Sequence, residues 1–364
     1  MKDLKIIELA SVLAGPSVGQ FFAELGAEVI KVESPNSGDV TRSWLAKSEK
    51  PDNTVSAYFS SVNWGKKSVT VDLSNLSERQ KIYQLTDQAD IVIASYKPGD
   101  AEKLGMDYHR LNERNPRLIY GQITGYGAHD PRVGYDAVIQ AESGFMSING
   151  KAADSPLKMP IAMIDLLAGH HLKEALLVAL IERIKSGNGR LVEVSLMDVA
   201  ISSLLNQGAN WLVGKNVPKA QGNAHPNIAP YGELFETKEG TKIILAIGND
   251  KQFERLCVLL SISIEDNYKT NKQRVVHREA LNQLLTVKMK EQSAYDLLPK
   301  LHSNQIPAGV YKTIDQALDH GADDWFLKSG SVTGLRTFAA QGIAKVDLNP
   351  PPQLGQHNQE VFRL

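Results

Sequence analysis

The sequence has little of several features that would place a protein in a special class. Cys257 is the only cysteine among 364 residues, so no disulfide can form within the chain, and we expect a reducing compartment, the cytoplasm. The formal net charge of −1 gives no basic field for nucleic acid and no polybasic membrane anchor. No run of 18 apolar residues indicates a membrane-spanning helix. Any anionic ligand must therefore be held by local groups.

The first turn of the chain lacks the glycine pattern of dinucleotide-binding proteins. The opening MKDLKIIELASVLAG is similar to a signal peptide, but Glu8 interrupts its apolar stretch, and the same residues make a good first strand. The turn ASVLAGPSVGQ then has only Gly15 and Gly19 where NAD-binding proteins have GxGxxG, although Glu33 ends the second strand as their ribose-binding acid does. We therefore expect no NAD and no other permanently bound cofactor.

What the sequence does contain is an alternation of strand and helix patterns. Strand patterns lie at 4–9, 28–33, 68–73, 90–94, 117–122 and 191–196. Helix patterns lie at 18–25, 77–89, around 108–112, 172–186 and 198–212. Strands that alternate with helices predict a mostly parallel sheet with helices on both faces, and so an α/β fold with a Rossmann-like large domain.

A change of composition indicates a second, smaller domain. Residues 214–230 are rich in Gly, Pro and Asn, which is typical of a linker or an active-site loop. Two strand patterns and three helix patterns follow, at 232–236, 242–248, 250–261, 277–290 and 293–302. The expected parts are a large domain over 1–200 plus 330–364, a linker over 201–230, and a small α+β domain with its return linker over 231–329.

Asp165 stands in an apolar run, PIAMIDLLAG, directly before the helix pattern of 172–186. A carboxylate in this place is either a helix cap or a reactive group, and the residues alone leave both alternatives open. A cap needs no apolar surroundings, whereas Asp165 has them. Near a helix N-terminus, exposed N–H groups would keep such a carboxylate ionised and nucleophilic. The two histidines that follow lack the spacing of a helical zinc pair, so no metal site is expected.

Lysines flank a Pro-Gly turn in SYKPGDAEKLG, directly after a strand pattern. Lys97 and Lys103 thus stand where α/β sheets bind ligands, and they are either phosphate contacts or solvated surface. Lys66 and Lys67, before another strand, carry the same ambiguity. A glycine-punctuated loop, which contains Tyr135, is suited to a ligand site as well as to an ordinary surface loop.

The chain resembles the class III CoA-transferases, the family of formyl-CoA transferase, carnitine CoA-transferase and α-methylacyl-CoA racemase. The resemblance covers nearly the whole chain, in the same order of segments. The segments are LASVLAGPSVGQFFAELGAEVIKVESPNSGDVTRSW, YFSSVNWGKKSVTVDL, ADIVIASYKPGDAEKLG, NPRLIYGQITGYG, VGYDAVIQAESG, GNGRLVEVSLMD, GNAHPNIAPYGELFETKEG, IPAGVYKTIDQAL and PPPQLGQHNQEV. The family resemblance implies an interlocked homodimer with candidate linkers at 199–230 and 303–330.

The resemblance also implies that Asp165 is the catalytic nucleophile. An enzymic carboxylate attacks the acyl-CoA thioester, expels CoA thiolate and leaves a mixed anhydride, which the thiolate converts into an aspartyl-CoA thioester. The acceptor acid then repeats these steps in reverse. Each step needs N–H donors for an oxyanion, and we expect them at the start of the 166–186 helix.

Positions that match CoA contacts of the family are also implied by the resemblance. They are Leu13, Ala14, Val71, Leu73, Ser74, Ser95, Tyr96, Lys97 and Lys103, with Tyr135 and Asp136 beside the thioester. One departure concerns Ser34, which follows Glu33 where the family often has arginine. One phosphate or adenine contact is therefore either missing or supplied elsewhere, with Arg42 as the candidate.

Two alternatives to transfer follow from the same resemblance. The racemase branch exchanges a proton beside the carbonyl with a histidine and an aspartate, and its histidine falls at Tyr135. Tyrosine, with an ordinary pKa near 10, is a poor base at neutral pH, which favours transfer. A non-catalytic CoA-binding protein is the other alternative, and the intact Asp165 argues against it. The expected partners are an acyl-CoA and a small carboxylic acid, without nucleic acid or membrane.

Overall fold

The structure is a computed structural model that describes residues 1–319 and 323–362. The chain divides into two compact units, and each is treated by itself. The first unit comprises Met1–Phe145, Met159–Leu205 and Ala322–Leu364, and the second comprises Met146–Lys158 and Asn206–Gly321. The expected return linker includes residues 320–322, which lie outside the described residues.

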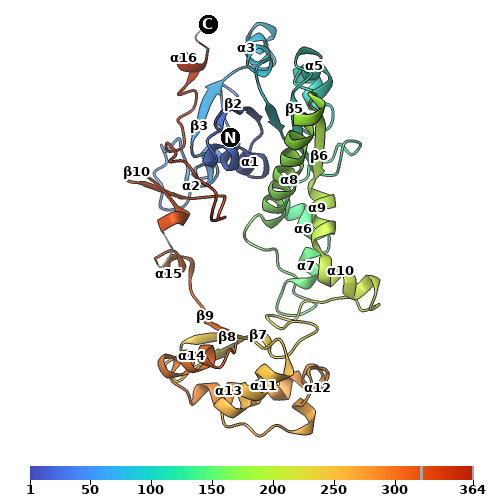
Figure 1. Ribbon diagram of the computed structural model, residues 1–364, viewed down its shortest axis with the longest axis vertical. Helices are drawn as coiled ribbons and strands as arrows, with labels where there is room; N and C mark the ends of the chain where they lie inside the picture. Colours follow the sequence, from blue (N-terminus) through green and yellow to red (C-terminus); the bar gives the residue numbers. More distant parts are fainter. Residues whose placement is uncertain (320–322, 363–364) are drawn as a thin grey trace. The chain divides into compact units, whose positions relative to one another are not determined.

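A six-stranded, entirely parallel sheet forms the centre of the first unit (Figure 1). Its order is β3-β2-β1-β4-β5-β6. The strands are β1 (Lys5–Leu9), β2 (Glu28–Glu33), β3 (Lys66–Thr70), β4 (Ile91–Ala94), β5 (Ile119–Thr124) and β6 (Leu191–Ser195). The prediction of a mixed α/β fold with a mostly parallel sheet is confirmed. The strand order reverses between β1 and β4, which is the point where such sheets open a ligand crevice.

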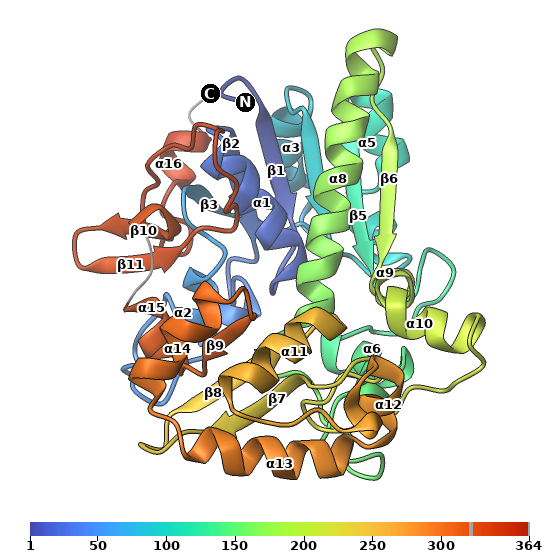
Figure 2. The same cartoon turned by 60° about the horizontal axis from the view of Figure 1, so that its bottom comes forward.

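Helices cover both faces of this sheet, each over its own core. Figures 1 and 2 show α1 (Ala14–Glu24) and α8 (Met163–Ser186) side by side on one face, where they pack on Ile6, Ile91 and Ile119. On the other face, α3 (Leu76–Thr86) and α5 (Tyr108–Arg114) pack on the opposite side chains of the same strands. The other elements of this unit include η1 (Val40–Ser43), α2 (Ala57–Ser60), α4 (Asp100–Leu104), α6 (Asp136–Glu142), α9 (Leu196–Ser203), η3 (Asp323–Trp325), β10 (Phe326–Ser329), β11 (Val332–Leu335) and α16 (Asn358–Val361).

The C-terminal segment closes one edge of the sheet. The N–H of His357 donates to the carbonyl of Ser68 at 3.0 Å, and its Nδ1 accepts from the N–H of Ser68 at 3.1 Å. Asn358 accepts from the N–H of Thr70 at 2.8 Å through its side chain. Because β3 is an edge strand, these contacts occupy backbone groups that would otherwise invite pairing with another chain.

The second unit holds a smaller sheet and a helical layer. Its three strands, β7 (Tyr231–Glu236), β8 (Lys242–Ala246) and β9 (Ala308–Val310), are antiparallel. The strand β9 was not predicted. The helices are η2 (Asp266–Tyr268), α11 (Asp250–Leu259), α12 (Asn271–Val276), α13 (Arg278–Lys290), α14 (Ala294–Ser303) and α15 (Ile314–Leu318). Short helices α7 (Phe145–Ile148) and α10 (Leu205–Leu212) begin at the boundaries of the units.

Two helix predictions are wrong in their extent. The helix predicted over 172–186 begins at Met163, so Asp165 lies within its first turn. The long helix predicted over 198–212 is two helices, because α9 ends at Ser203 and Leu205 takes a left-handed φ of 33°. Ser202 lies at the end of α9 and donates its hydroxyl to the carbonyl of Val199, an alternative bond that disfavours a continuous helix.

Candidate active site

Two cavities open at the carboxyl ends of β1 and β4, where the strand order reverses. They share three lining residues, Ser11, Ser95 and Tyr96, which follow these two strands directly. The larger cavity has a volume of about 340 Å³ and the smaller one about 180 Å³. The topology therefore brings two adjoining cavities to the place where α/β sheets bind ligands.

Most of the residues predicted from the sequence line one of these cavities. The larger cavity is lined by Val71, Leu73, Ser74, Ser95 and Tyr96. The smaller cavity is lined by Ala14, Ser95, Tyr96, Lys97, Tyr135 and Asp165. Leu13, Lys103 and Asp136 do not line either cavity, although each is a chain neighbour or contact of residues that do.

Asp165 does not cap its helix. The N-cap residue of α8 is Ala162, which makes no side-chain cap bond, and Asp165 is the third helical residue. The carboxylate that serves the helix N-terminus is Asp136, whose Oδ2 accepts from the N–H of Ile164 at 2.7 Å. In the described part of the chain, no donor is bonded to the carboxylate of Asp165. The cap interpretation that the sequence left open is therefore wrong.

The carboxyl group of Asp165 is buried and electrostatically strained. Its residue is 8% exposed, and burial together with the negative charge of Asp136 raises its pKa from 3.8 to about 7. The sequence had indicated the opposite, a carboxylate kept ionised by helix N–H groups. Three of those groups have partners elsewhere: Met163 donates to Ile161, Ile164 to Asp136, and Leu166 to Ala162. The expectation that the helix start supplies oxyanion donors stays a prediction.

Asp136 is held from two sides. Besides the amide of Ile164, it accepts from Nε2 of Gln140 at 2.6 Å. Gln140 is 1% exposed and also accepts from the N–H of Met159 at 2.9 Å, just before α8. The second carboxylate of the site is thus fixed relative to Asp165 by α6 and by the first turn of α8. Sequence reasoning missed Gln140, whose only local signal is its position one helical turn after Asp136.

Lys97 and Lys103 both turn toward Asp100. Their Nζ atoms lie 3.5 and 3.1 Å from its carboxylate, and their side chains are 50% and 75% exposed. Exposed pairs of this kind are weak and exchange readily with a ligand anion. Lys97 lines the smaller cavity, while Lys103 stands outside it.

Lys66 and Lys67 have structural partners. Lys66 is fully buried and donates to Glu8 at 2.7 Å, to the carbonyl of Pro16 and to Asn63. Burial lowers its pKa to about 8, against the opposing charge of Glu8. Lys67 bridges Glu28 and Glu360. The phosphate-binding alternative is therefore wrong for Lys66, whose donors are engaged inside the protein.

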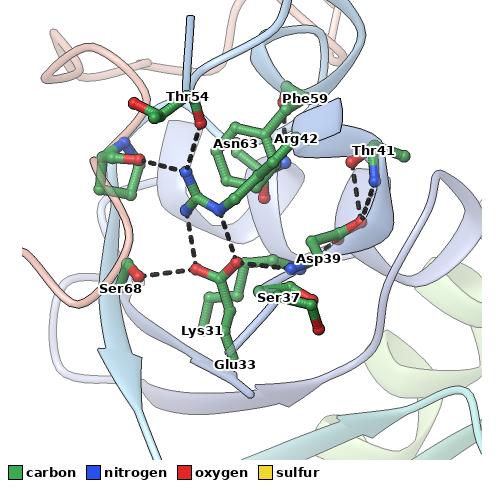
Figure 3. A network of polar contacts seen from close by, with 12 residues as sticks. Lys31, Glu33, Ser37, Asp39, Thr41, Arg42, Thr54, Phe59, Asn63 and Ser68 are labelled. Carbon is green, nitrogen blue, oxygen red and sulfur yellow. Dashed lines mark hydrogen bonds and ion pairs between the residues drawn. The ribbon is translucent and has the colours of Figure 1, made fainter. Parts of the chain in front are cut away.

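Arg42 does not replace the arginine expected at Ser34 (Figure 3). Its guanidinium forms a bidentate pair with Glu33 at 2.7 and 2.8 Å and donates to the carbonyls of Thr54 and Pro352. Burial alone would raise the pKa of Glu33, but the bond from Arg42 and the charges of Lys31 and Arg42 hold it below its usual range. Four of its five N–H donors are thus engaged in this buried network, which argues against Arg42 as the phosphate contact.

Lys31 and Asp39 form the floor of the larger cavity and were not predicted. Their side chains are 1% and 0% exposed and lie 2.9 Å apart as an ion pair. Burial opposes the charge on Asp39, but Lys31 and Thr41 hold its pKa below the usual range. The sequence signal is weak, since a lysine in a strand and an aspartate 8 positions later reveal no contact.

Comparison with known proteins identifies the family of the chain. The model of CoA-transferase family III matches residues 1–360. A succinate–glutarate CoA-transferase of Agrobacterium fabrum is 37% identical over 100% of this chain and 94% of its own length. The succinyl-CoA:glutarate CoA-transferase of Homo sapiens is 33% identical over 100% of this chain and 85% of its own.

Solved structures are similar as well. A CAIB/BAIF family protein from Brucella suis superposes with a TM-score of 0.85 at 37% identity, over 98% of this chain and 97% of the other. Within the described residues, no helix is long and apolar enough to cross a bilayer. The same residues contain no group of three or more His, Cys, Asp or Glu side chains that could hold a metal ion. The chain therefore belongs to CoA-transferase family III and is a CoA-transferase.

Proposed function

We propose that this enzyme moves CoA from an acyl-CoA donor to a carboxylic acid through covalent intermediates on Asp165. The observation that carries the proposal is the state of this residue. Asp165 lines a cavity, is bonded to no donor within the described residues, and has its pKa raised to about 7 by burial and by Asp136. A carboxylate with a raised pKa is more basic than an ordinary aspartate and is therefore the better nucleophile once ionised.

The first half-reaction has two steps on this carboxylate. An oxygen of Asp165 bonds to the thioester carbonyl carbon, the carbon–sulfur bond breaks, and CoA leaves as a thiolate. The thiolate then attacks Cγ of Asp165, which forms an aspartyl-CoA thioester and releases the donor acid as a carboxylate. The acceptor carboxylate reverses both steps, so the new acyl-CoA departs and Asp165 is free again.

We place acyl-CoA along both cavities. The larger cavity, with Val71, Leu73 and Ser74 on its wall, offers room for the nucleotide, and Ser95 and Tyr96 lead from it to Asp165. Lys97 stands beside this path and is suited to a phosphate of CoA. In this arrangement Tyr135 borders the thioester, Leu13 and Ala14 adjoin the adenosine or pantetheine arm, and Lys103 contributes from outside the cavities.

Asp136 acts as an electrostatic partner of Asp165 in this proposal. Two hydrogen bonds, from Ile164 and Gln140, hold its carboxylate in place beside Asp165. Its negative charge disfavours ionisation of Asp165 while the site is empty. When the Asp165 oxygen becomes part of an anhydride or thioester, that repulsion disappears, which lowers the energy of the covalent states relative to the free enzyme.

The relatives point to dicarboxylic acids as substrates. The two relatives described above are named for transfer between succinate or succinyl-CoA and glutarate. In the smaller cavity, the basic residues on the described wall are Lys97 and Arg132. Arg132 is paired with Asp130 and Glu142, so a dicarboxylate would exchange with these partners at the surface.

The proposed function also includes an assembly and a location in the cell. We propose the interlocked homodimer and the cytoplasmic location that the family resemblance implies. Sedimentation of the active enzyme at micromolar concentration tests the assembly, since a fully active monomer is incompatible with it.

Trapping with hydroxylamine tests the covalent mechanism. Enzyme incubated with succinyl-CoA and hydroxylamine should carry a hydroxamate on the peptide that contains Asp165, detected by mass spectrometry. Asp165→Asn should carry none and should lose nearly all activity, since an amide does not attack the thioester. Glu142→Gln, a change at a carboxylate that lines neither cavity, should still give the adduct. Absence of an adduct in the wild-type enzyme would refute the mechanism.

Racemisation of a 2-methylacyl-CoA is the second candidate. It requires a base beside the α-carbon, and the residue at this position is Tyr135, 55% exposed at the N-terminus of α6. A racemase would incorporate deuterium from heavy water into the substrate without an acceptor acid. We expect little incorporation over the time of a complete transfer reaction, and fast acceptor-independent uptake would favour racemisation.

A further inference from the structure

The turn between β1 and α1 borders both cavities, and three consecutive residues of it are held through their backbone. The carbonyl of Ala10 accepts from Nζ of Lys31 at 2.7 Å. The N–H of Ser11 donates to Oγ of Ser95 at 3.2 Å. The N–H of Val12 donates to the carboxylate of Asp39, 3.2 Å from Oδ2. Side chains from β2, from the segment before η1 and from the end of β4 thus fix one short turn.

Val12 has an unfavourable backbone conformation. Its φ is 70°, in the left-handed region that β-branched residues rarely adopt. Such a conformation persists only where the surroundings impose it. Ser11 lines both cavities and Val12 lines the one that contains Asp165, so the strained turn forms part of the wall of both.

Lys31 and Asp39, two of the three groups that hold the turn, are a single ion pair. Lys31 also contacts Glu8 at 3.1 Å, and Asp39 also accepts from the N–H and the hydroxyl of Thr41 at 3.0 and 2.7 Å. The N–H of Asp39 in turn donates to Glu33 at 2.9 Å. Figure 3 shows the carboxylate of Asp39 with its neighbours Lys31 on β2 and Thr41 on η1.

We propose that Lys31 and Asp39 are positioning residues for CoA transfer. Together they hold the β1–α1 turn in its strained form, and this form places a bound acyl-CoA with its thioester at Asp165. The inference rests on the proposed function for the location of the thioester. Neither residue reacts; both act through the backbone of Ala10 and Val12.

Lys66 provides a matched control. It is as buried as Lys31 and is bonded to the same carboxylate, that of Glu8. Its other contacts are the carbonyl of Pro16 and Asn63, and it makes no bond to the turn. A change of either lysine to methionine removes one charge from the same cluster, but Lys31→Met alone releases the turn.

The test compares steady-state kinetics of Lys31→Met and Lys66→Met with succinyl-CoA and glutarate, at a temperature where circular dichroism shows both folded. Lys31→Met should raise KM for succinyl-CoA about tenfold and lower kcat as well, because a small displacement of the thioester is costly to the reaction. Lys66→Met should change both parameters less than about twofold, because Lys66 shares Glu8 with Lys31 but bonds to none of the residues Ala10, Ser11 and Val12. Equal losses in the two variants, or an unchanged Lys31→Met, would overturn the positioning role.

A second change separates positioning from stability. Glycine adopts a φ of 70° without strain, so in a Val12→Gly background the turn has less tendency to leave its form when the lysine is lost. The factor by which Lys31→Met lowers kcat/KM should therefore be smaller in the Val12→Gly background than in the wild-type enzyme. Identical factors would show that Lys31 does not act through the turn.

Two further outcomes have to be considered, a Lys31→Met variant that does not fold and a wild-type enzyme without a covalent adduct. If Lys31→Met does not fold, Asp39→Ala is used, which removes both oxygens that accept from the N–H of Val12; the same rise in KM is expected, and a normal KM overturns the proposal. Hydroxylamine trapping in the wild-type enzyme reports separately on the covalent mechanism. A wild type without adduct would refute that mechanism while the contrast between Lys31→Met and Lys66→Met still decides the role of the ion pair.

Discussion

The N–H of Ile164 donates to Oδ2 of Asp136 at 2.7 Å, so one carboxylate caps the helix whose first turn carries the other. Asp136 makes the capping contact with α8 that Asp165 would make if it were an ordinary helix cap. As a result Asp165 is left buried, without a donor among the described residues, and next to a negative charge. The helix N-terminus stabilises the partner and not the group that is proposed to react.

Replacing Asp136 by asparagine should move the pH dependence of transfer. Asp165 must be ionised to attack, so kcat/KM of the wild type should rise with pH through about 7 and then level off. Asp136→Asn removes the neighbouring charge and lowers the pKa of Asp165, so the rise should occur at lower pH. Burial is the larger cause of the raised pKa of Asp165, and it remains in this variant. The rise in kcat/KM should therefore still occur at a pH above the ordinary pKa of an aspartate.

The control for this profile is Glu142→Gln on the same helix, whose charge does not contribute to the shift of Asp165. Its profile should coincide with the wild type. A profile of Asp136→Asn that stays in place or moves to higher pH would contradict the electrostatic account.

Asp165→Asn should make the protein more stable at alkaline pH. The folded-state pKa of about 7 exceeds the ordinary 3.8, so the folded state retains a proton that the unfolded state loses, and wild-type stability falls as pH rises between these values. The total loss is at most about 4 kcal/mol. Asparagine cannot ionise, so the variant should gain in Tm over the wild type at pH 8 and gain little at pH 4.5. Calorimetry at both pH values checks this; an equal gain at both would show that ionisation is not the cause.

Lys97→Ala should raise KM for acyl-CoA with a smaller change in kcat, because binding is lost equally in the ground and transition states. The effect should be weaker with dephospho-CoA esters if the lysine meets the 3′-phosphate. Lys103→Ala should have the smaller effect of the two, since Lys103 stands outside the cavities.

Asp100→Asn should change KM for acyl-CoA in the direction opposite to Lys97→Ala. It removes the carboxylate that now pairs with both lysines and leaves them free for phosphate. KM for acyl-CoA should therefore fall, most clearly at low salt. A rise in KM would indicate that Asp100 orders the lysines and does not compete for them.

Ser34→Arg should strengthen binding of CoA esters. Ser34 is exposed on the wall of the larger cavity, and Arg42 is committed to Glu33, so no arginine now serves this position. An arginine there can reach phosphate or stack on adenine. KM for succinyl-CoA should decrease relative to wild type, whereas Ser34→Gln, similar in length but uncharged, should leave it unchanged. Equal KM values for Ser34→Arg and Ser34→Gln would show that the nucleotide of CoA does not lie beside Ser34.

The sheet could be predicted from the sequence because its signals are local. Each strand of the parallel sheet is a short apolar run between a turn and a helix pattern, and the six expected runs all lie on the observed strands within a few residues. The strand β9 was missed because three residues, Ala308–Val310, carry no pattern of their own and owe their conformation to pairing with β8.

The site was predictable only where one residue carries the signal. Asp165, Lys97 and the segment 71–74 stand at strand or helix ends; the sequence singled them out, and the structure places them on the two cavities. The roles of Asp136 and Asp39 were not found, because each depends on contacts made across the fold: Asp136 bonds to Ile164, 28 positions away, and Asp39 to Val12, 27 positions away. For the same reason the pKa of Asp165 was expected in the wrong direction.

The covering of strand β3 by the C-terminal segment has a consequence for biosynthesis. Synthesis proceeds from the N-terminus, so the six strands of the parallel sheet are complete long before His357 and Asn358 emerge from the ribosome. During that interval the backbone groups of Ser68 and Thr70 that these residues later occupy are open to other chains. The edge of the first unit at β3 thus stays uncovered while the whole of the second unit is translated.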